Sequence, residues 1–262
     1  MSKNTTTPSA PRGQAREALR RRQQQQAAAQ KRLRTIVRTA WIAGITVIAL
    51  IVGVMVWAVA GARSSSTALP ASGEPAVPAF ATPAGAIQFG KTDAKTTVSV
   101  YADYMCPFCG RFERANGESL QRLVAAGTVR LEIHPMAFLD SQSAGSKYST
   151  RAANAFVTIA NTDPAAALRF NQLLFANQPT EGTSGLTDQQ LAALAGQAGA
   201  AQEVVASFGR QAYAPWVAQL TQKAFDAGVT GTPTVKINGQ VFTGDLYTPG
   251  ALDAAIRQAS GA

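Results

Sequence analysis

The 262-residue chain has few of the residues that build metal sites and disulfide scaffolds, since it carries two cysteines and one histidine. Two cysteines exclude a disulfide-rich fold and a zinc site made of four cysteines. Charged residues make up only 15% of the chain, but hydrophobic residues make up 46%. That content suffices for a folded core and excludes global disorder.

The net charge of +9 comes from one end of the chain. Residues 1–38 hold ten lysines and arginines against Glu17, whereas residues 64–262 hold 13 basic and 14 acidic residues. A basic segment can bind nucleic acid or anionic lipid, but residues 1–38 contain no aromatic ring for base stacking. We therefore predict no nucleic-acid partner and interpret the segment as a cytoplasmic tail that sets membrane topology.

Residues 39–62 carry no charge and are predicted to form a single transmembrane helix. A helix of that length extends about 36 Å, which exceeds a hydrocarbon layer of about 30 Å. Trp41 and Trp57 lie near its ends, where indole rings prefer the interface. A cleaved signal peptide with a site at Ala60-Gly-Ala62 is the alternative, but the apolar stretch exceeds the roughly 7–15 residues of a signal peptide. We expect an uncleaved anchor in the cell membrane, with the C-terminal part outside the cytoplasm.

Residues 63–85 are rich in Pro, Ala and Ser, which predicts an extended linker. Residues 86–262 are predicted to fold, with helices replacing strands over about 146–227. Strands are expected at 87–89, 96–102, 128–133, 234–237 and 240–242, the first of them pairing with the second. Helices are expected at 106–126, with a possible kink at Asn116-Gly117, and at 147–160, 164–177, 188–195, 201–208, 214–227 and from Thr248 to 259. This order indicates an α/β sheet with a helical insertion.

Both cysteines lie in the motif Cys106-Pro107-Phe108-Cys109, which joins the predicted strand 96–102 to a helix. A helix N-terminus favours negative charge, and the thiolate is the reactive form of cysteine. Two cysteines one helical turn apart can close a disulfide. We expect Cys106 to be the exposed, attacked sulfur and Cys109 to be the buried resolving thiol.

Two other uses of this motif are weaker. A zinc site needs two further ligands, and His134 is the only histidine. A purely structural disulfide across so short a loop would restrict the unfolded chain little. The motif therefore predicts redox chemistry with no metal and no cofactor.

Around this motif the chain resembles the DsbA-type thioredoxin-fold proteins. The resemblance rests on the segment from Tyr101 to Cys109, on Gly231-Thr-Pro-Thr234 before a strand and an Asn238-Gly239 hairpin, and on the helical insertion. It covers residues 86–262. It implies a thioredoxin fold with an inserted helical domain, here preceded by the transmembrane helix, as in the anchored forms of high-GC Gram-positive bacteria.

The resemblance also implies a cis peptide bond between Thr232 and Pro233 beside the disulfide. The backbone of Thr232 would pair with an extended substrate segment by strand addition. One departure concerns Phe108, because the commonest oxidase of this family carries a histidine there that can stabilise the thiolate. Without that charge, the thiolate would depend on the helix N-terminus.

Four further residues are weighed as contributors to the site. Asp103 and Glu113 are near the motif in sequence, and either could accept a proton from the buried thiol, although solvated carboxylates are the simpler interpretation. His134 follows the predicted strand 128–133 and is expected to be structural. Trp216 could line a substrate groove, with core packing favoured.

We predict an extracytoplasmic oxidoreductase that forms disulfides in exported proteins through Cys106 and Cys109. A quinone-linked membrane partner, implied by the resemblance alone, would reoxidise it. A reductase or isomerase on the same fold remains an alternative. A second is an anchored module that binds peptides at Thr232 and Pro233 without catalysis. The sequence leaves the clients, the reduction potential and the oligomeric state open.

Overall fold

The computed structural model describes residues 75–261. Their five strands form one sheet in the order β1-β3-β2-β4-β5. The strands are β1 (Ile87–Phe89), β2 (Thr96–Ala102), β3 (Val129–Pro135), β4 (Thr234–Ile237) and β5 (Gln240–Val241). Strands β2 and β3 are parallel, and the other neighbours are antiparallel. The predicted tail 1–38, the predicted span 39–62 and most of the predicted linker lie outside the described residues.

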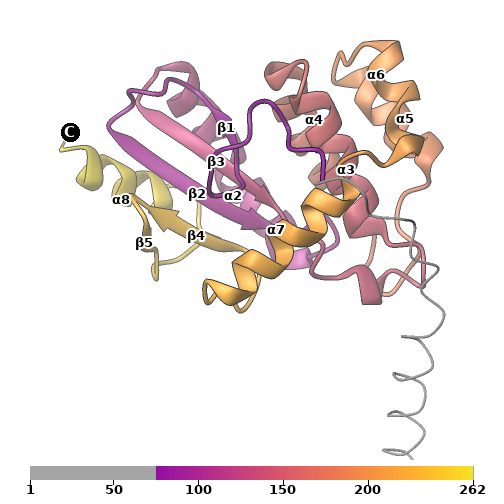
Figure 1. The fold of residues 1–262 in the computed structure, drawn as a ribbon. Coiled ribbons are helices and arrows are strands. Elements are labelled where there is room, and N and C mark those ends of the chain that lie inside the picture. Colours follow the sequence, from indigo (N-terminus) through magenta and orange to yellow (C-terminus); the bar gives the residue numbers. More distant parts are fainter. Residues whose placement is uncertain (1–74, 262) are drawn as a thin grey trace, which may run out of the picture. The chain divides into compact units, whose positions relative to one another are not determined.

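The helices follow the predicted segments closely. They are α2 (Pro107–Ala125), α3 (Tyr148–Ala160), α4 (Pro164–Ala176), α5 (Asp188–Gln197), α6 (Gln202–Ala206), α7 (Ala214–Asp226) and α8 (Ala251–Ser260), with short 3-10 turns at Asp140–Gln142 and Phe208–Arg210. Within residues 75–261, no helix is both long and apolar enough to cross a membrane. In Figure 1, α3 to α6 gather at one end of the sheet, and α8 lies toward the other.

Alternating side chains of β2 and β3 divide the core into two faces. Val100, Ala102, Leu131 and Ile133 face α2 and α4. Tyr101 points to the opposite face, where it contacts a small apolar cluster that includes Ala224 of α7. Helices α2 and α7 therefore cover opposite faces of the sheet, and β2 is central between β3 and β4.

The pairing predicted for the first strand is wrong. Strand β1 pairs with β3, with Ile87 opposite Ile133, and does not pair with β2. Both edges of β2 are already occupied, because the parallel crossover through α2 places β3 on one side and β4 lies on the other. Only the far edge of β3 is left for β1.

The start of the last helix is also two residues later than predicted. Helix α8 begins at Ala251, with Gly250 at its N-cap position. Thr248 does not cap it, because the hydroxyl and backbone N–H of Thr248 donate to the carboxylate of Asp245. The same carboxylate accepts a hydrogen bond from the Tyr247 backbone, so Asp245 closes a turn before the helix.

Candidate active site

Cys106 is placed at the N-cap of α2, with Pro107 at the first helical position. Its N–H donates to the Asp103 carbonyl at 3.0 Å, which turns the chain from the end of β2 into the helix. The N–H of Cys109 donates to the Cys106 carbonyl at 3.0 Å and closes the first helical turn. This turn places Cys106 at the positive end of the helix, where a thiolate is stabilised.

The two thiols differ in access and in acidity. Both are free in this structure; Cys106 is 5% exposed and Cys109 is fully buried. The pKa of Cys106 is lowered from 9.0 to about 6, chiefly by a hydrogen bond from the Cys109 thiol. The Thr232 hydroxyl and the N–H groups of Cys109 and Phe108 add to this effect against the opposing effect of burial.

The pKa of Cys109 moves the other way. Burial raises it well above 9.0, and the hydrogen bond to Cys106 and the negative charge of that neighbour raise it further. At neutral pH the reduced pair therefore holds one thiolate, on Cys106, and one thiol, on Cys109.

The loop before β4 closes over the pair. The Thr232–Pro233 peptide bond is cis, as the resemblance implied. The Cys106 sulfur lies 3.2 Å from the Thr232 carbonyl oxygen, to which it donates when it is protonated. The loop is itself fixed by the Thr234 hydroxyl, which donates to the Gly231 carbonyl at 2.7 Å. Phe108, the residue in place of the common histidine, is 51% exposed and points away from the core.

Asp103 is fully buried next to the pair. Its carboxylate accepts hydrogen bonds from the Met105 N–H, the Leu139 N–H and the Ser149 hydroxyl at 2.7–2.8 Å. Burial raises the pKa of Asp103 to about 6, although these hydrogen bonds oppose the rise, and the charge of Cys106 adds to it. Asp103 is therefore not the solvated carboxylate that the sequence favoured.

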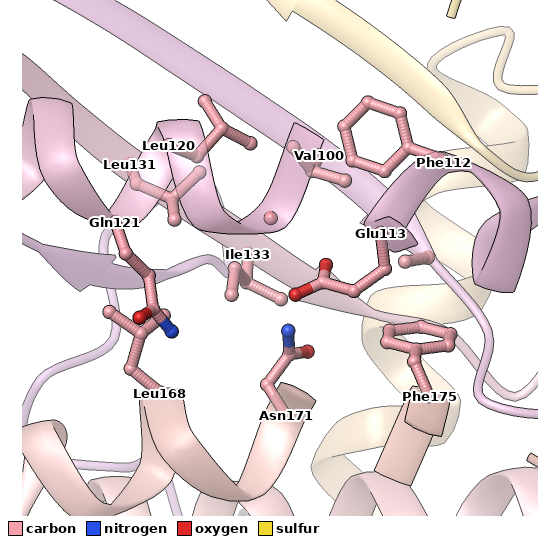
Figure 2. Close-up of a pocket in the computed structure, with 12 residues that line it drawn as sticks. Val100, Phe112, Glu113, Leu120, Gln121, Leu131, Ile133, Leu168, Asn171 and Phe175 are labelled. Atoms are coloured by element: carbon pink, nitrogen blue, oxygen red, sulfur yellow. The ribbon is translucent and has the colours of Figure 1, made fainter. Parts of the chain in front are cut away.

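Glu113 lies one turn after Cys109 and lines a small pocket of about 20 Å³ between α2, α4 and the sheet. Figure 2 shows its carboxyl group directed at Asn171 of α4 among apolar side chains. Burial among these side chains raises the pKa of Glu113 to about 7, and a hydrogen bond to Asn171 opposes the rise. A Cβ at Gly117 would lie 2.5 Å from the Glu113 carboxyl oxygen, so any larger residue there would displace the Glu113 side chain. Helix α2 is continuous through Asn116 and Gly117, so this pair does not interrupt it.

Comparisons with known proteins agree with this geometry. A family model described as thioredoxin matches residues 82–258, which is more than half of the chain. The chain belongs to the thioredoxin family. The reduced disulfide bond oxidoreductase DsbG of Mycobacterium tuberculosis is 32% identical and matches with a TM-score of 0.61 over 70% of this chain and 90% of that chain.

Other solved structures place the protein within the same family. Oxidised DsbA of Mycobacterium tuberculosis is 32% identical, with a TM-score of 0.59 over 68% of this chain and 93% of that chain. Oxidised BdbD of Bacillus subtilis, at 22% identity and a TM-score of 0.59 over 72% of this chain and 100% of that chain, supports the fold. The domain formed by residues 86–261 is of the DsbA type, a thioredoxin fold with a helical insertion.

A curated relative shares only part of the DsbA-type domain. The serine/threonine-protein kinase PknE of Mycobacterium tuberculosis is 36% identical over 115 residues, which cover 42% of this chain and 20% of the kinase. The chain therefore spans about a fifth of the length of the curated relatives it matches.

The helical insertion supplies a contact to the thioredoxin-fold site that no motif in the sequence indicates. Gln178 follows α4, and its side-chain amide donates to the carbonyls of Tyr104 and Cys106 at 3.1 and 2.8 Å. The Tyr104 hydroxyl in turn donates to Asn171 of α4. The insertion thus holds the turn that carries Cys106, through residues with no spacing or motif to mark them.

The remaining candidates lie away from the DsbA-type cysteine pair. His134 is inside β3 rather than after it, and its ring stacks on Tyr101 with centroids 4.0 Å apart. Burial lowers the pKa of His134 to about 4, so the imidazole is neutral at pH 7. Trp216 is buried in the core, as favoured. Both residues are structural in this fold.

Proposed function

We propose that the protein forms disulfide bonds in exported proteins, with Cys106 and Cys109 as its redox pair. The observation that carries this proposal is the opposite shift of the two thiol pKa values at one helix N-terminus. A stabilised thiolate on Cys106 favours the reduced form of the pair over its disulfide. A pair that is more stable when reduced is an oxidant toward client thiols.

The proposed reaction has two exchange steps. A client thiolate attacks the Cys106 sulfur of the Cys106–Cys109 disulfide and forms a mixed disulfide, and Cys109 leaves as a thiolate that takes up a proton. A second client thiolate then attacks the client sulfur of the mixed disulfide. Cys106 leaves as the stabilised thiolate, so the client is oxidised by two electrons and the enzyme pair is reduced.

Thr232 and Pro233 are proposed to hold the client during this exchange. Within residues 75–261 the Thr232 N–H makes no backbone hydrogen bond, while the Thr232 carbonyl lies against Cys106. Pro233 has no N–H to offer. An extended client segment could pair with the Thr232 backbone by strand addition, with its cysteine beside Cys106.

The site of action is proposed from the sequence. Residues 39–62 would anchor the chain, and the basic residues of 1–38 would keep that end in the cytoplasm. The redox domain would then face exported proteins with free thiols. A quinone-linked membrane partner would accept the two electrons from the reduced pair. Protease protection of the full chain in intact cells tests the topology, since a redox domain protected from external protease would contradict it.

A direct test uses the oxidised full chain and a reduced client with two cysteines. We expect stoichiometric client oxidation with the wild-type chain and none with Cys106→Ala. In the reverse direction, reduced Cys109→Ser mixed with the oxidised client should accumulate the mixed disulfide: Cys106 attacks the client disulfide and one client sulfur leaves as a thiolate, but the thiol that would release Cys106 is missing. Full client oxidation by Cys106→Ala would exclude the cysteine mechanism, whereas client binding without oxidation by the wild-type chain would favour the non-catalytic peptide-binding module.

A reductase or isomerase would use the same residues at a lower reduction potential. The lowered pKa of Cys106 favours an oxidase, because a stabilised thiolate stabilises the reduced pair. A measured potential near the −270 mV of thioredoxin would restore that alternative.

A further inference from the structure

A basic and aromatic hollow lies beside the reactive cysteine. Arg111, Arg114 and Ala115 of α2 form one wall, and Tyr247 and Pro249 of the β5–α8 loop form the other, around about 330 Å³. Both arginines are exposed on the helix that begins at Cys106. The hollow is thus open to solvent and adjoins the start of that helix.

Among the residues that the structure describes, the arginines in this hollow have no acidic partner. The ion pairs within residues 75–261 join Arg130 to Glu132 and Arg151 to Asp188, and no hydrogen bond there uses Arg111 or Arg114. Glu118, one turn beyond Arg114, also forms no ion pair with it.

The nearest acidic group to the hollow is already occupied. Arg111 helps to lower the pKa of Asp245, but the Asp245 carboxylate is held by the backbone and hydroxyl donors of its own turn. Two guanidinium groups are therefore free to bind an external anion.

The aromatic rings hold one of these arginines in place. The Arg111 guanidinium lies 4.5 Å from the Tyr247 ring centroid and 5.9 Å from that of the exposed Phe108. Stacking on a ring orders the guanidinium and leaves its edge donors available. An ordered guanidinium edge matches a carboxylate, which can accept two parallel hydrogen bonds.

The hollow also lies within reach of a client bound at Cys106. Tyr247 is close enough for the charges of Cys106 and Cys109 to affect its hydroxyl. Phe108 belongs to the redox motif and its ring lies 5.9 Å from the Arg111 guanidinium, so the hollow adjoins the turn that carries Cys106. An extended chain advances about 3.3 Å per residue, so a side chain two to four residues from the client cysteine reaches the arginines.

We propose that this hollow selects client segments that carry an aspartate or glutamate two to four residues from the reacting cysteine. The proposal rests on the proposed function and adds a substrate preference to it. A peptide is favoured over a lipid surface because polybasic lipid sites use about four to eight basic residues, whereas two arginines line this hollow.

The test measures the oxidation rate of two-cysteine peptides by the oxidised full chain. Each peptide carries the same residue at the position three before and the position three after its first cysteine. This residue is Asp in one peptide, Asn in the second and Lys in the third. The variants are Arg111→Gln/Arg114→Gln, the charge reversal Arg111→Glu/Arg114→Glu, and Arg122→Gln as a control on the exposed far end of α2. The intrinsic reactivity of each peptide cancels when its rates are compared between variants.

We expect the Asp-to-Lys rate ratio to fall about fivefold to tenfold in the double glutamine variant, as two partly exposed ion pairs would give. The charge reversal should favour the Lys peptide, a result that misfolding cannot produce. Arg122→Gln should keep the wild-type ratio, and high salt should weaken the preference.

An unchanged ratio in both double variants would overturn the proposal. The proposal would also be overturned if the double variants lost binding to phosphatidylglycerol vesicles but kept the wild-type peptide ratios. That result would make the hollow a lipid-binding site. If the wild-type chain oxidises no peptide at all, the proposed function itself fails. Equal reaction of all three peptides removes only the substrate preference.

Discussion

The thiol of Cys106 lies 3.2 Å from the carbonyl oxygen of Thr232, although 126 positions separate the two residues in sequence. The contact joins the N-terminus of α2 to the loop before β4. It brings the Thr232 hydroxyl next to the sulfur, where it helps to lower the pKa of the thiol.

The first prediction concerns that hydroxyl. Thr232→Val keeps the branched shape but removes the hydrogen bond, so the pKa of Cys106 should rise from about 6. A bond of about 0.5–1.5 kcal/mol corresponds to a rise of up to about one pH unit. Absorbance of the thiolate at 240 nm, followed against pH, measures it. Thr234→Val is the matched control, because that hydroxyl binds Gly231 instead; an equal rise in both variants would contradict the assignment.

The second prediction is a pH profile for the reduced protein. Cys106 should react with iodoacetamide at a rate that rises as pH increases through about 6 and then levels off, because its thiolate forms over that range. Cys109 should stay unmodified at neutral pH, because burial keeps it a thiol. Peptide mapping by mass spectrometry distinguishes the two. Modification of Cys109 first would reverse the assigned roles.

The third prediction tests the contact from the helical insertion. Gln178→Ala removes two hydrogen bonds to the turn that carries Cys106, and should lower the free energy of unfolding by about 1–2 kcal/mol. Gln178→Glu should also raise the pKa of Cys106, since a carboxylate would lie near the thiolate. Gln222→Ala, at an exposed position on α7, is the control. Urea unfolding and the 240 nm titration report the two effects, and a silent Gln178→Glu would refute the positioning role.

The fourth prediction concerns the stability of the fold and the partly buried Glu113. The pKa of Glu113 is about 7 in the folded state, compared with 4.5 for an ordinary glutamate, which represents the unfolded chain. Protonation of Glu113 therefore stabilises the folded state. The contribution is fully present below about pH 4.5 and is lost as pH rises through about 7. Glu113→Gln should therefore make the protein about 1–3 kcal/mol more stable than wild type at pH 8, with little difference at pH 4.5.

Urea unfolding of the reduced protein at the two pH values measures the effect of Glu113. The exposed Glu118 offers a control, since Glu118→Gln should not alter the pH dependence. The pKa of Asp103 is also raised, so Asp103 contributes to the loss of wild-type stability as pH rises. This contribution should remain in Glu113→Gln. A Glu113→Gln protein that loses stability between pH 4.5 and 8 as steeply as wild type would rule out this origin.

Local signals predicted much of the fold. The bounds of β2 match the expected strand 96–102, and Thr187 and Gln190 form the capping box that their spacing indicates. Both features depend on residues within one element. The cysteine motif is equally local, because a strand end, a proline at the first helical position and two cysteines one turn apart suffice to place both sulfurs.

The features that sequence could not predict are long-range. The partner of β1 depends on which sheet edge remains free once β3 and β4 are in place. Ser149 and Gln178 reach the site from the insertion and carry no motif, and Asp103 looked solvated until the insertion covered it. A residue's hydrogen-bond partners depend on tertiary packing, which a single sequence does not encode in any spacing.

The reduction potential of the Cys106–Cys109 pair tests the central claim most directly. Equilibration of the full chain with glutathione buffers gives it, with Cys106→Ala as the blank. A lowered pKa at Cys106 stabilises the reduced state, so we predict a potential between about −200 and −120 mV, in the range of enzymes that form disulfides. A value at or below about −270 mV would contradict the account and identify a reductase.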